Sequence, residues 1–220
     1  MRWGILLLFT WVTATAQDQW KNVYTESAWK DRDRWQKPEE LIRMLNLKRD
    51  SEVADLGCHE GYMTVKLASV VASGHVYAVD LNATRLSQLK SHLASRQISN
   101  VETIQGDASD PHLPANKLDA LVILDAYHEM NSHQEILAHV KRALKPGGRL
   151  LICEPIADER RRLTRSEQQG KHEIGLSFVL EDLGKAGFKV VKQSDPFIDR
   201  SREKGDMMWI ILATPVRDSK

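Results

Sequence analysis

From residue 52 onward, short runs rich in β-branched residues alternate with longer segments of helical period, and this alternation most constrains the fold. The runs are EVADL (52–56), HVYAVD (75–80), VETIQ (101–105), LDALVIL (118–124) and RLLICE (149–154). Helical patterns lie between them, with apolar residues gathered on one face of 83–96 and of 132–144. Strands and helices that take turns predict a parallel sheet covered by helices on both faces.

The end of the chain departs from this alternation. A helix predicted over 177–187 leads to a strand over 188–193, and a polar loop then connects to a strand over 207–214. Because no helical segment separates the last two strands, they should pair antiparallel as a hairpin. The sequence therefore predicts an α/β fold, with a doubly wound, mostly parallel, seven-stranded sheet that ends in a C-terminal antiparallel hairpin.

The first 50 residues have a different character from the rest of the 220. Arg2, the apolar stretch 3–12 and the A-x-A pattern that ends at Ala16 are typical of a secretory signal peptide. The pattern predicts cleavage after Ala16, so that 1–16 is lost and the protein is exported to the periplasm or secreted. An uncleaved anchor or a chance apolar start are the alternatives, although the stretch is short for a membrane span.

After this segment, residues 17–50 are interpreted as an N-terminal arm that packs on the main domain or covers its site. Pro38 suits the first position of a short amphipathic helix, whereas residues 17–37 show no clean period. Trp20, Tyr24, Trp29 and Trp35 lie in the arm, and packing on the sheet is the default reading for such rings. Residues 51–220 form the main domain.

The charge balance and the cysteine content give no support for nucleic-acid binding, a disulfide or a zinc site. With 31 Lys and Arg against 30 Asp and Glu, the net charge of +1 gives no case for a nucleic-acid-binding protein. Cys58 and Cys153 lie in separate apolar strand contexts, which makes a disulfide unlikely on geometry. No Cys/His spacing is typical of zinc, and no metal is expected.

The loops that follow the strands are the places to look for a ligand, because open α/β sheets bind ligands beyond the carboxyl ends of their strands. After the first strand, Gly57 and Gly61 allow a sharp turn and a close approach of the backbone. Asp80 ends the second strand, where a carboxylate can accept hydrogen bonds from both hydroxyls of a ribose. A dinucleotide loop would place a third glycine at Tyr62, which disfavours a nicotinamide-dependent oxidoreductase.

This set resembles the class I S-adenosylmethionine (SAM)-dependent methyltransferases over about residues 38–214. Their first loop, [D/E]-x-G-x-G-x-G, is matched at Asp55, Gly57 and Gly61, and His59 replaces the central glycine. The acid of YAVDLN, the Gly106-Asp107 pair and LKPGGRL (144–150) match further parts of the pattern. The resemblance implies SAM as the cofactor and a set of cofactor-binding residues: Asp55, Gly57, Cys58, His59, Gly61, Asp80, Leu81, Asp107, Ala108 and Asp125.

DAYHEM (125–130) follows the fourth strand, where these methyltransferases place groups close to the transferring methyl. Asp125, Tyr127 and His128 are the candidate catalytic residues, and His128 is the natural general base because imidazole ordinarily titrates near neutral pH. A structural role, as a helix cap or a bridge between loops, is equally compatible with this position. Metal-dependent O-methylation has weak support, although Asp125 and Glu154 lie on strands that can bring them together.

A segment after the fifth strand supplies further candidates for contact with the acceptor. Four arginines there either recognise an anionic acceptor or form a solvated helical face, and they are Arg160, Arg161, Arg162 and Arg165. His172 is the second candidate.

The sequence thus predicts methyl transfer from SAM to a small-molecule acceptor that it does not identify, without a nucleic-acid partner and without a stable membrane span after signal cleavage. The alternatives are a non-catalytic SAM-binding domain, which the replacement at His59 favours, and a nicotinamide-dependent oxidoreductase. The oligomeric state stays open.

Overall fold

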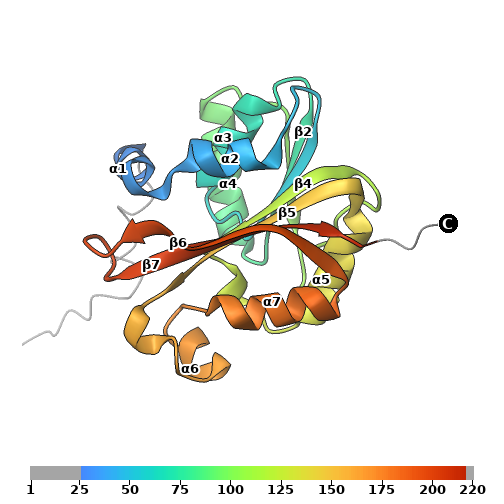
Figure 1. Ribbon diagram of the computed structural model, residues 1–220. Helices are drawn as coiled ribbons and strands as arrows, with labels where there is room; N and C mark the ends of the chain where they lie inside the picture. Colours follow the sequence, from blue (N-terminus) through green and yellow to red (C-terminus); the bar gives the residue numbers. More distant parts are fainter. Residues whose placement is uncertain (1–25, 217–220) are drawn as a thin grey trace, which may run out of the picture.

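A computed structural model describes residues 26–216 and contains one seven-stranded sheet (Figure 1). Its strand order is β3-β2-β1-β4-β5-β7-β6. The strands are β1 (Glu52–Leu56), β2 (His75–Asp80), β3 (Val101–Gln105), β4 (Leu118–Leu124), β5 (Leu144–Ile156), β6 (Phe188–Arg200) and β7 (Asp206–Pro215). The first five pair in parallel, whereas β7 runs antiparallel to both β5 and β6. The predicted fold and its terminal hairpin are confirmed.

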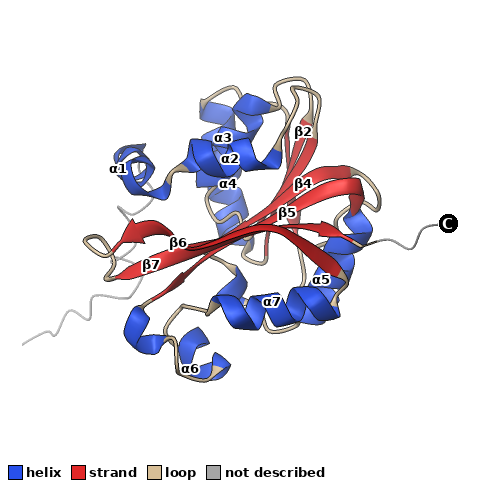
Figure 2. Ribbon diagram, viewed as in Figure 1, coloured by secondary structure: helices blue, strands red, loops and turns tan. Residues whose placement is uncertain are grey.

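Helices cover both faces of this sheet (Figure 2). The helices are α1 (Glu26–Gln36), α2 (Pro38–Leu45), α3 (Tyr62–Val70), α4 (Ala83–Ser95), α5 (His133–Ala143), α6 (Arg165–Gln169) and α7 (Leu176–Lys185). α2, α3 and α4 lie on one face, and α5 and α7 lie on the other. Their ends carry local signals, since Pro38 begins α2 and the Asn82 side chain accepts hydrogen bonds from the backbone at Thr84 and Arg85 of α4.

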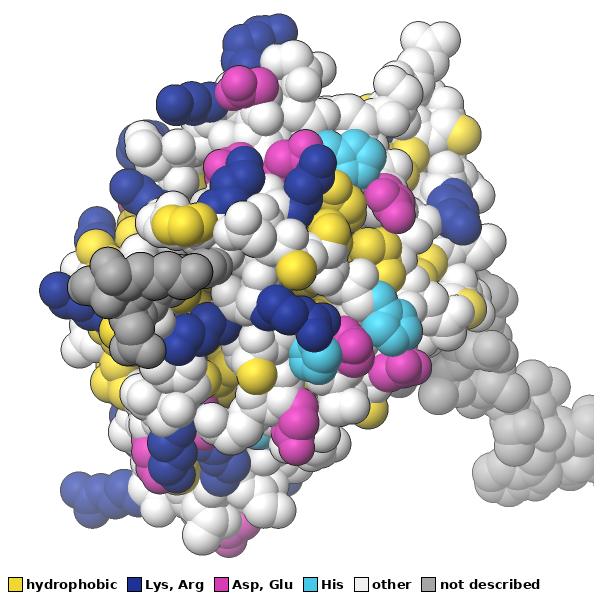
Figure 3. Space-filling view, turned by 90° about the vertical axis from the view of Figure 1, so that its right-hand side faces the viewer, with side chains coloured by type: hydrophobic (Ala, Val, Ile, Leu, Met, Phe, Trp, Pro, Cys, Tyr) yellow, Lys and Arg dark blue, Asp and Glu magenta, His cyan; other side chains and the backbone are white. Residues whose placement is uncertain are grey.

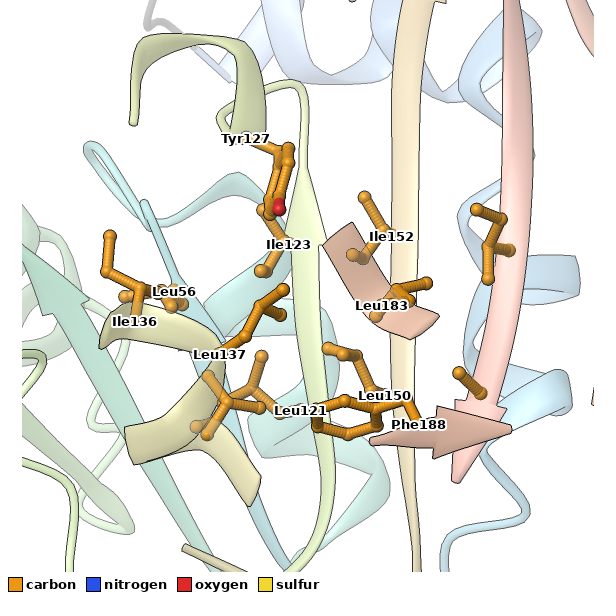
Figure 4. Packing of buried hydrophobic residues seen from close by; sticks show 14 of the residues in the cluster. Leu56, Leu121, Ile123, Tyr127, Ile136, Leu137, Leu150, Ile152, Leu183 and Phe188 are labelled. Carbon is orange, nitrogen blue, oxygen red and sulfur yellow. The ribbon is translucent and has the colours of Figure 1, made fainter. Parts of the chain in front are cut away.

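The core lies on both sides of β4, a strand that is buried on both faces. Leu121 and Ile123 point toward α5 and α7, where they pack with Leu137 and Leu183 (Figure 4). Alternate residues of the same strand, such as Val122, join the opposite cluster with α2 and α3. A strand that is buried on both faces fixes the register of its neighbours, because a shift by one residue would exchange the two core faces.

The order of the strands reverses between β1 and β4, so their carboxyl ends diverge toward helices on opposite faces. This is the position where doubly wound sheets bind ligands. The loops after β1, β2 and β4 all leave this edge of the sheet, and α1, α6 and the β6–β7 turn lie at the same end of the molecule (Figure 1).

The structure adds one helix to the sequence prediction and lengthens several strands, among them β5, which was predicted over 149–154. The chain forms a helix over Glu26–Gln36, where the prediction saw no period, because its aromatic residues pack against another helix: the Trp29 and Tyr62 rings lie 6.1 Å apart. β6 continues to Arg200, far beyond the predicted end at 193, because β7 pairs with it along the added length.

The predicted signal peptide (1–16) and the first part of the arm lie outside the described residues. Within residues 26–216, no helix combines the length and the apolar character that crossing a bilayer requires. On the side of the molecule in Figure 3, acidic and basic side chains are interspersed, as the balanced charge of the chain leads one to expect.

Candidate active site

The loop after β1 is shaped by its two glycines. Gly57 has φ +80°, and a Cβ there would lie 2.5 Å from the Cβ of Ala126 in the loop after β4. Gly61 has φ +95°, and a Cβ there would lie 2.3 Å from Leu89 Cδ1 of α4. Both positions therefore require glycine, for the turn and for close packing. Gly57 also brings the first loop against the loop that carries the candidate catalytic residues.

Asp80 connects this loop to the end of β2. Its Oδ2 accepts the backbone N–H of His59 at 2.9 Å, and its Oδ1 accepts that of Asn82 at 2.9 Å. Each carboxylate oxygen has a second lone pair, and Asp80 is only half-buried. The carboxylate is thus oriented by the backbone and can still accept hydrogen bonds from a vicinal diol.

His59 takes part in the loop through its backbone and its ring. Its φ is +52°, a left-handed conformation that glycine adopts more easily. Its ring contacts the buried carboxylate of Glu60, which also pairs with Arg85. The histidine therefore preserves the turn that the usual glycine makes, and its ring adds a contact with the Glu60 carboxylate.

Asp55 and Cys58 lie deeper than the resemblance suggests. Asp55 is buried and accepts a 2.6 Å hydrogen bond from Thr64 Oγ1, and burial raises its pKa to about 6. The Cys58 side chain packs with Leu86 and Leu89, and its N–H is taken by Val79 O at 3.0 Å. The thiol of Cys58 is buried and its N–H is already paired, and the cofactor role of this residue stays a prediction.

Three of the predicted cofactor-binding residues, Leu81, Asp107 and Ala108, gather at the ends of β2 and β3. Leu81 is an exposed apolar side chain, 58% accessible, directly after Asp80. The Gly106 N–H donates to Asp80 O at 3.1 Å, which places exposed Asp107 and Ala108 beside it. An exposed apolar side chain next to a carboxylate suits a flat ring with polar edges.

Asp125 follows β4 in a left-handed conformation, with φ +57°. Its N–H donates to Cys153 O at 2.9 Å, and its Oδ2 lies 3.1 Å from Arg200 Nη1. Burial alone would raise the pKa of Asp125, but the charges of Arg200 and Arg32 lower it below the usual range. Asp125 is therefore ionised. The sequence did not point to either arginine, because both come from elements distant in the chain.

His128 is held by the buried carboxylate of Glu154 at the end of β5. Glu154 Oε2 lies 2.6 Å from His128 Nδ1, and Oε1 accepts the N–H groups of Ala126 and Tyr127, both at 2.7 Å. Burial alone would lower the pKa of His128, but the hydrogen bond and charge of Glu154, with Asp125 and Glu129, raise it. The anchoring leaves Nε2 of His128 on the side of Glu129, 3.4 Å from its Oε1.

Tyr127, a predicted catalytic residue, does not reach the site. Its ring is fully buried beside Ile123 (Figure 4), and its hydroxyl donates to Asp182 Oδ2 of α7 at 3.0 Å. The short helical turn over Tyr127–Glu129 buries the side chains of Tyr127 and His128 and exposes that of Glu129. The predicted catalytic role is wrong because the Tyr127 hydroxyl is directed to Asp182 in the core, whereas His128 is directed to Glu154.

The segment after β5 contributes a histidine to the site and uses its arginines elsewhere. Three of the four arginines pair with acids of the same region: Arg160 with Glu173, Arg161 with Asp195 and Arg165 with Asp182. These pairings favour a structural role for the arginines over recognition of an anionic acceptor. His172 instead lies across from the loop after β4, with Nδ1 2.5 Å from Glu129 Oε1.

The described residues contain two groups of three possible metal ligands. One joins Asp125, His128 and Glu154, and the other joins His128, Glu129 and His172, with the ligand atoms of each group within 4.8 Å of one another. The sequence predicted no metal site and noted only that Asp125 and Glu154 might approach.

Comparison with known proteins supports the fold and its cofactor. Residues 53–148 match the family described as "Methyltransferase domain". A demethylmenaquinone methyltransferase of Geobacillus sp. (strain WCH70) is 27% identical over 117 residues, 53% of this chain and 50% of that protein. A protein-L-isoaspartate O-methyltransferase of Vibrio campbellii (strain ATCC BAA-1116) is 33% identical over 141 residues, 64% and 62% of the two chains. The chain thus spans about half to three-fifths of the length of these relatives.

A SAM-dependent methyltransferase from Aquifex aeolicus has the same fold, with a TM-score of 0.72 and 22% identity over 88% of this chain and 100% of that one. The oriented Asp80, the glycine turn and the exposed Leu81 fit a nucleoside-containing cofactor at the switch point. Residues 53–148 therefore resemble a methyltransferase domain, and the described chain has the fold of a class I SAM-dependent methyltransferase.

Proposed function

We propose that the protein is a SAM-dependent methyltransferase that acts on a small-molecule acceptor. One observation carries this proposal: the loops after β1, β2 and β4 meet where the strand order reverses. The N–H of His59 orients the Asp80 carboxylate, and Gly57 lies against Ala126. In this proposal Asp80 binds the ribose, Leu81 and Asp107 lie on the adenine side, and the loop 57–61 binds the amino-acid end.

Methyl transfer from SAM requires the protein mainly to align the acceptor with the methyl group. Bound SAM supplies a methyl group already activated by its sulfonium charge. The chain must then hold the acceptor in line with that methyl, which lowers the entropic cost of the displacement. His128 is the candidate general base, because Glu154 fixes its ring and leaves Nε2 facing the loop edge. A base is needed only for an acceptor that does not lose its proton unaided.

A turnover assay tests this proposal. The full chain is incubated with SAM labelled in the methyl group and with a panel of oxygen, nitrogen and carbon nucleophiles, and labelled product is counted. We expect transfer to at least one acceptor, and we expect Asp80→Ala to abolish it. Binding of S-adenosylhomocysteine without transfer to any acceptor would support the non-catalytic alternative, and absence of binding would contradict both.

Export is a separate part of the proposal. The basic start, the apolar stretch 3–12 and the A-x-A pattern support removal of 1–16 and a periplasmic or secreted mature chain. N-terminal sequencing of the protein from its native host should begin at Gln17. A chain that retains Met1 in the cytoplasmic fraction would contradict export.

A further inference from the structure

We propose that His128, Glu129 and His172 form a binding site for one divalent transition-metal ion of the zinc class. His128 Nε2 lies 3.4 Å from Glu129 Oε1, and His172 Nδ1 lies 2.5 Å from the same oxygen. All three ligand atoms lie within 4.8 Å of one another, so one ion can contact them after small side-chain rotations. Two imidazoles and one carboxylate also form the protein ligand set of several catalytic zinc sites.

The inner histidine has the support that metal-binding histidines usually have. Glu154, fully buried, lies 2.6 Å from His128 Nδ1, where it can accept the Nδ1 proton, so Nε2, which lies toward Glu129, is the ring nitrogen available to an ion. A carboxylate behind the ligand histidine fixes the ring and its tautomer. The other group of possible ligands shares His128, but Glu154 there accepts backbone N–H groups and Asp125 pairs with Arg200. That group therefore positions His128 and is not itself the site.

The outer histidine is held opposite His128 by a contact between distant segments. Gln169 Nε2 donates to His128 O and to Met130 O, both at 3.0 Å, and so joins the end of α6 to the loop after β4. The His128 and His172 rings then lie 5.9 Å apart and nearly perpendicular. His172 has φ +57°, an uncommon conformation for a residue other than glycine. The backbone thus brings the two imidazoles together across 44 positions (172 − 128).

The ligand atoms indicate which ion can bind, and the exposure of the site indicates that a further ligand can reach that ion. Mg²⁺ prefers oxygen ligands, whereas imidazole nitrogen suits zinc and its transition-metal neighbours. The Glu129 and His172 side chains are 61% and 74% accessible, so the coordination positions not filled by protein face solvent. His128 and Glu129 lie on the loop whose Ala126 lies against Gly57, where an oxygen of the acceptor can bind the ion. Because a bound ion occupies His128 Nε2, the metal-bound form would activate that oxygen through the ion and would not use His128 as a general base.

Zinc titration of the purified protein tests the site. The full chain is prepared without an affinity tag, since tag histidines bind zinc, stripped with a chelator, and titrated with Zn²⁺ and separately with Mg²⁺ by calorimetry. We expect one Zn²⁺ per chain and no Mg²⁺ binding. Glu129→Gln and His172→Ala should each lower zinc affinity at least 10-fold. Glu154→Gln should lower it by about 10-fold to 100-fold through the orientation of His128.

His75→Ala is the matched control, because His75 also faces a carboxylate, that of Glu102 at 3.6 Å, at the start of β2. It should bind zinc as the wild type does. Glu129 and His172 are exposed, so their variants should fold, and circular dichroism and S-adenosylhomocysteine binding on the same samples verify this independently of the metal. Zinc binding that Glu129→Gln and His172→Ala leave unchanged, or folded wild type that binds no zinc, would overturn the proposal.

Discussion

The Tyr127 hydroxyl donates to Asp182 in the core, 3.0 Å away, and Arg165 pairs with the same carboxylate at 2.8 Å. Removal of the hydroxyl should therefore affect stability and not cofactor binding. We expect Tyr127→Phe to lower the free energy of unfolding by about 1.5–3 kcal/mol, the usual contribution of a hydrogen bond to a charged group. Urea unfolding measures the loss, and calorimetry with S-adenosylhomocysteine should give wild-type affinity. Lost affinity in a folded variant would return Tyr127 to the site.

Asp55 is a residue whose burial should make stability depend on pH. Its pKa is raised from 3.8 to about 6 in the native state, so the native state binds the proton more tightly than the unfolded state does. The destabilising effect is absent below pH 3.8, grows as the pH rises, and is complete above pH 6. It amounts to about 3 kcal/mol, on the basis of 1.36 kcal/mol per pKa unit.

The substitution Asp55→Asn removes this titration. The unfolding free energy of the variant, relative to that of the wild type, should increase by about 2 kcal/mol between pH 4 and pH 7, because part of the effect is already present at pH 4. Denaturant unfolding of both proteins at several pH values provides the measurement. A difference that stays constant with pH would show that Asp55 titrates alike in the folded and unfolded states.

At the scale of elements, the loop after β4 depends on one carboxylate of β5. Glu154, which is fully buried, accepts two backbone N–H groups of this loop and contacts His128 Nδ1. Glu154→Ala should lower the free energy of unfolding by about 3–5 kcal/mol, the cost of removing one partner of a buried pair.

Glu102→Ala, which removes the exposed partner of His75, is the comparison variant and should change stability by about 1 kcal/mol or less. Equal effects of the two substitutions in urea unfolding would show that the loop does not depend on Glu154.

The elements also show what sequence patterns can and cannot predict. β1 to β4 have the predicted bounds, because each is an apolar run closed by turn residues. α1 was missed, since its residues are held by contacts with another element: Asp33 accepts the Tyr62 hydroxyl at 2.7 Å and pairs with Lys66. Contacts between elements that are distant in the chain leave no hydrophobic period in the local sequence.

The same limit applies to the candidate site. Gly57, Gly61 and Asp80 follow directly from the ends of strands, so their placement could be predicted from the order of the elements. The approach of His172 to His128 depends on how α6 and its Gln169 dock on the loop after β4. Tyr127 was misjudged because position in a loop does not determine which way a side chain points.

For the whole molecule, the sheet brings the loops after β1, β2 and β4 to one edge, where the strand order reverses. α1 and α6 lie at this end (Figure 1). The charge of Arg32, on α1, also acts on both Asp55 and Asp125. The arm predicted to pack on or cover the domain thus contributes a cation to the candidate site through its first described helix.

Calorimetric titration of the full chain with S-adenosylhomocysteine tests the central claim most directly. We expect one site per chain, loss of binding in Asp80→Ala, and affinity in His59→Gly equal to or higher than that of the wild type, because glycine preserves the turn and its N–H to Asp80. Loss of binding in His59→Gly would instead make the imidazole a required contact. No binding by the folded wild type, or unchanged binding by Asp80→Ala, would contradict the assigned cofactor site.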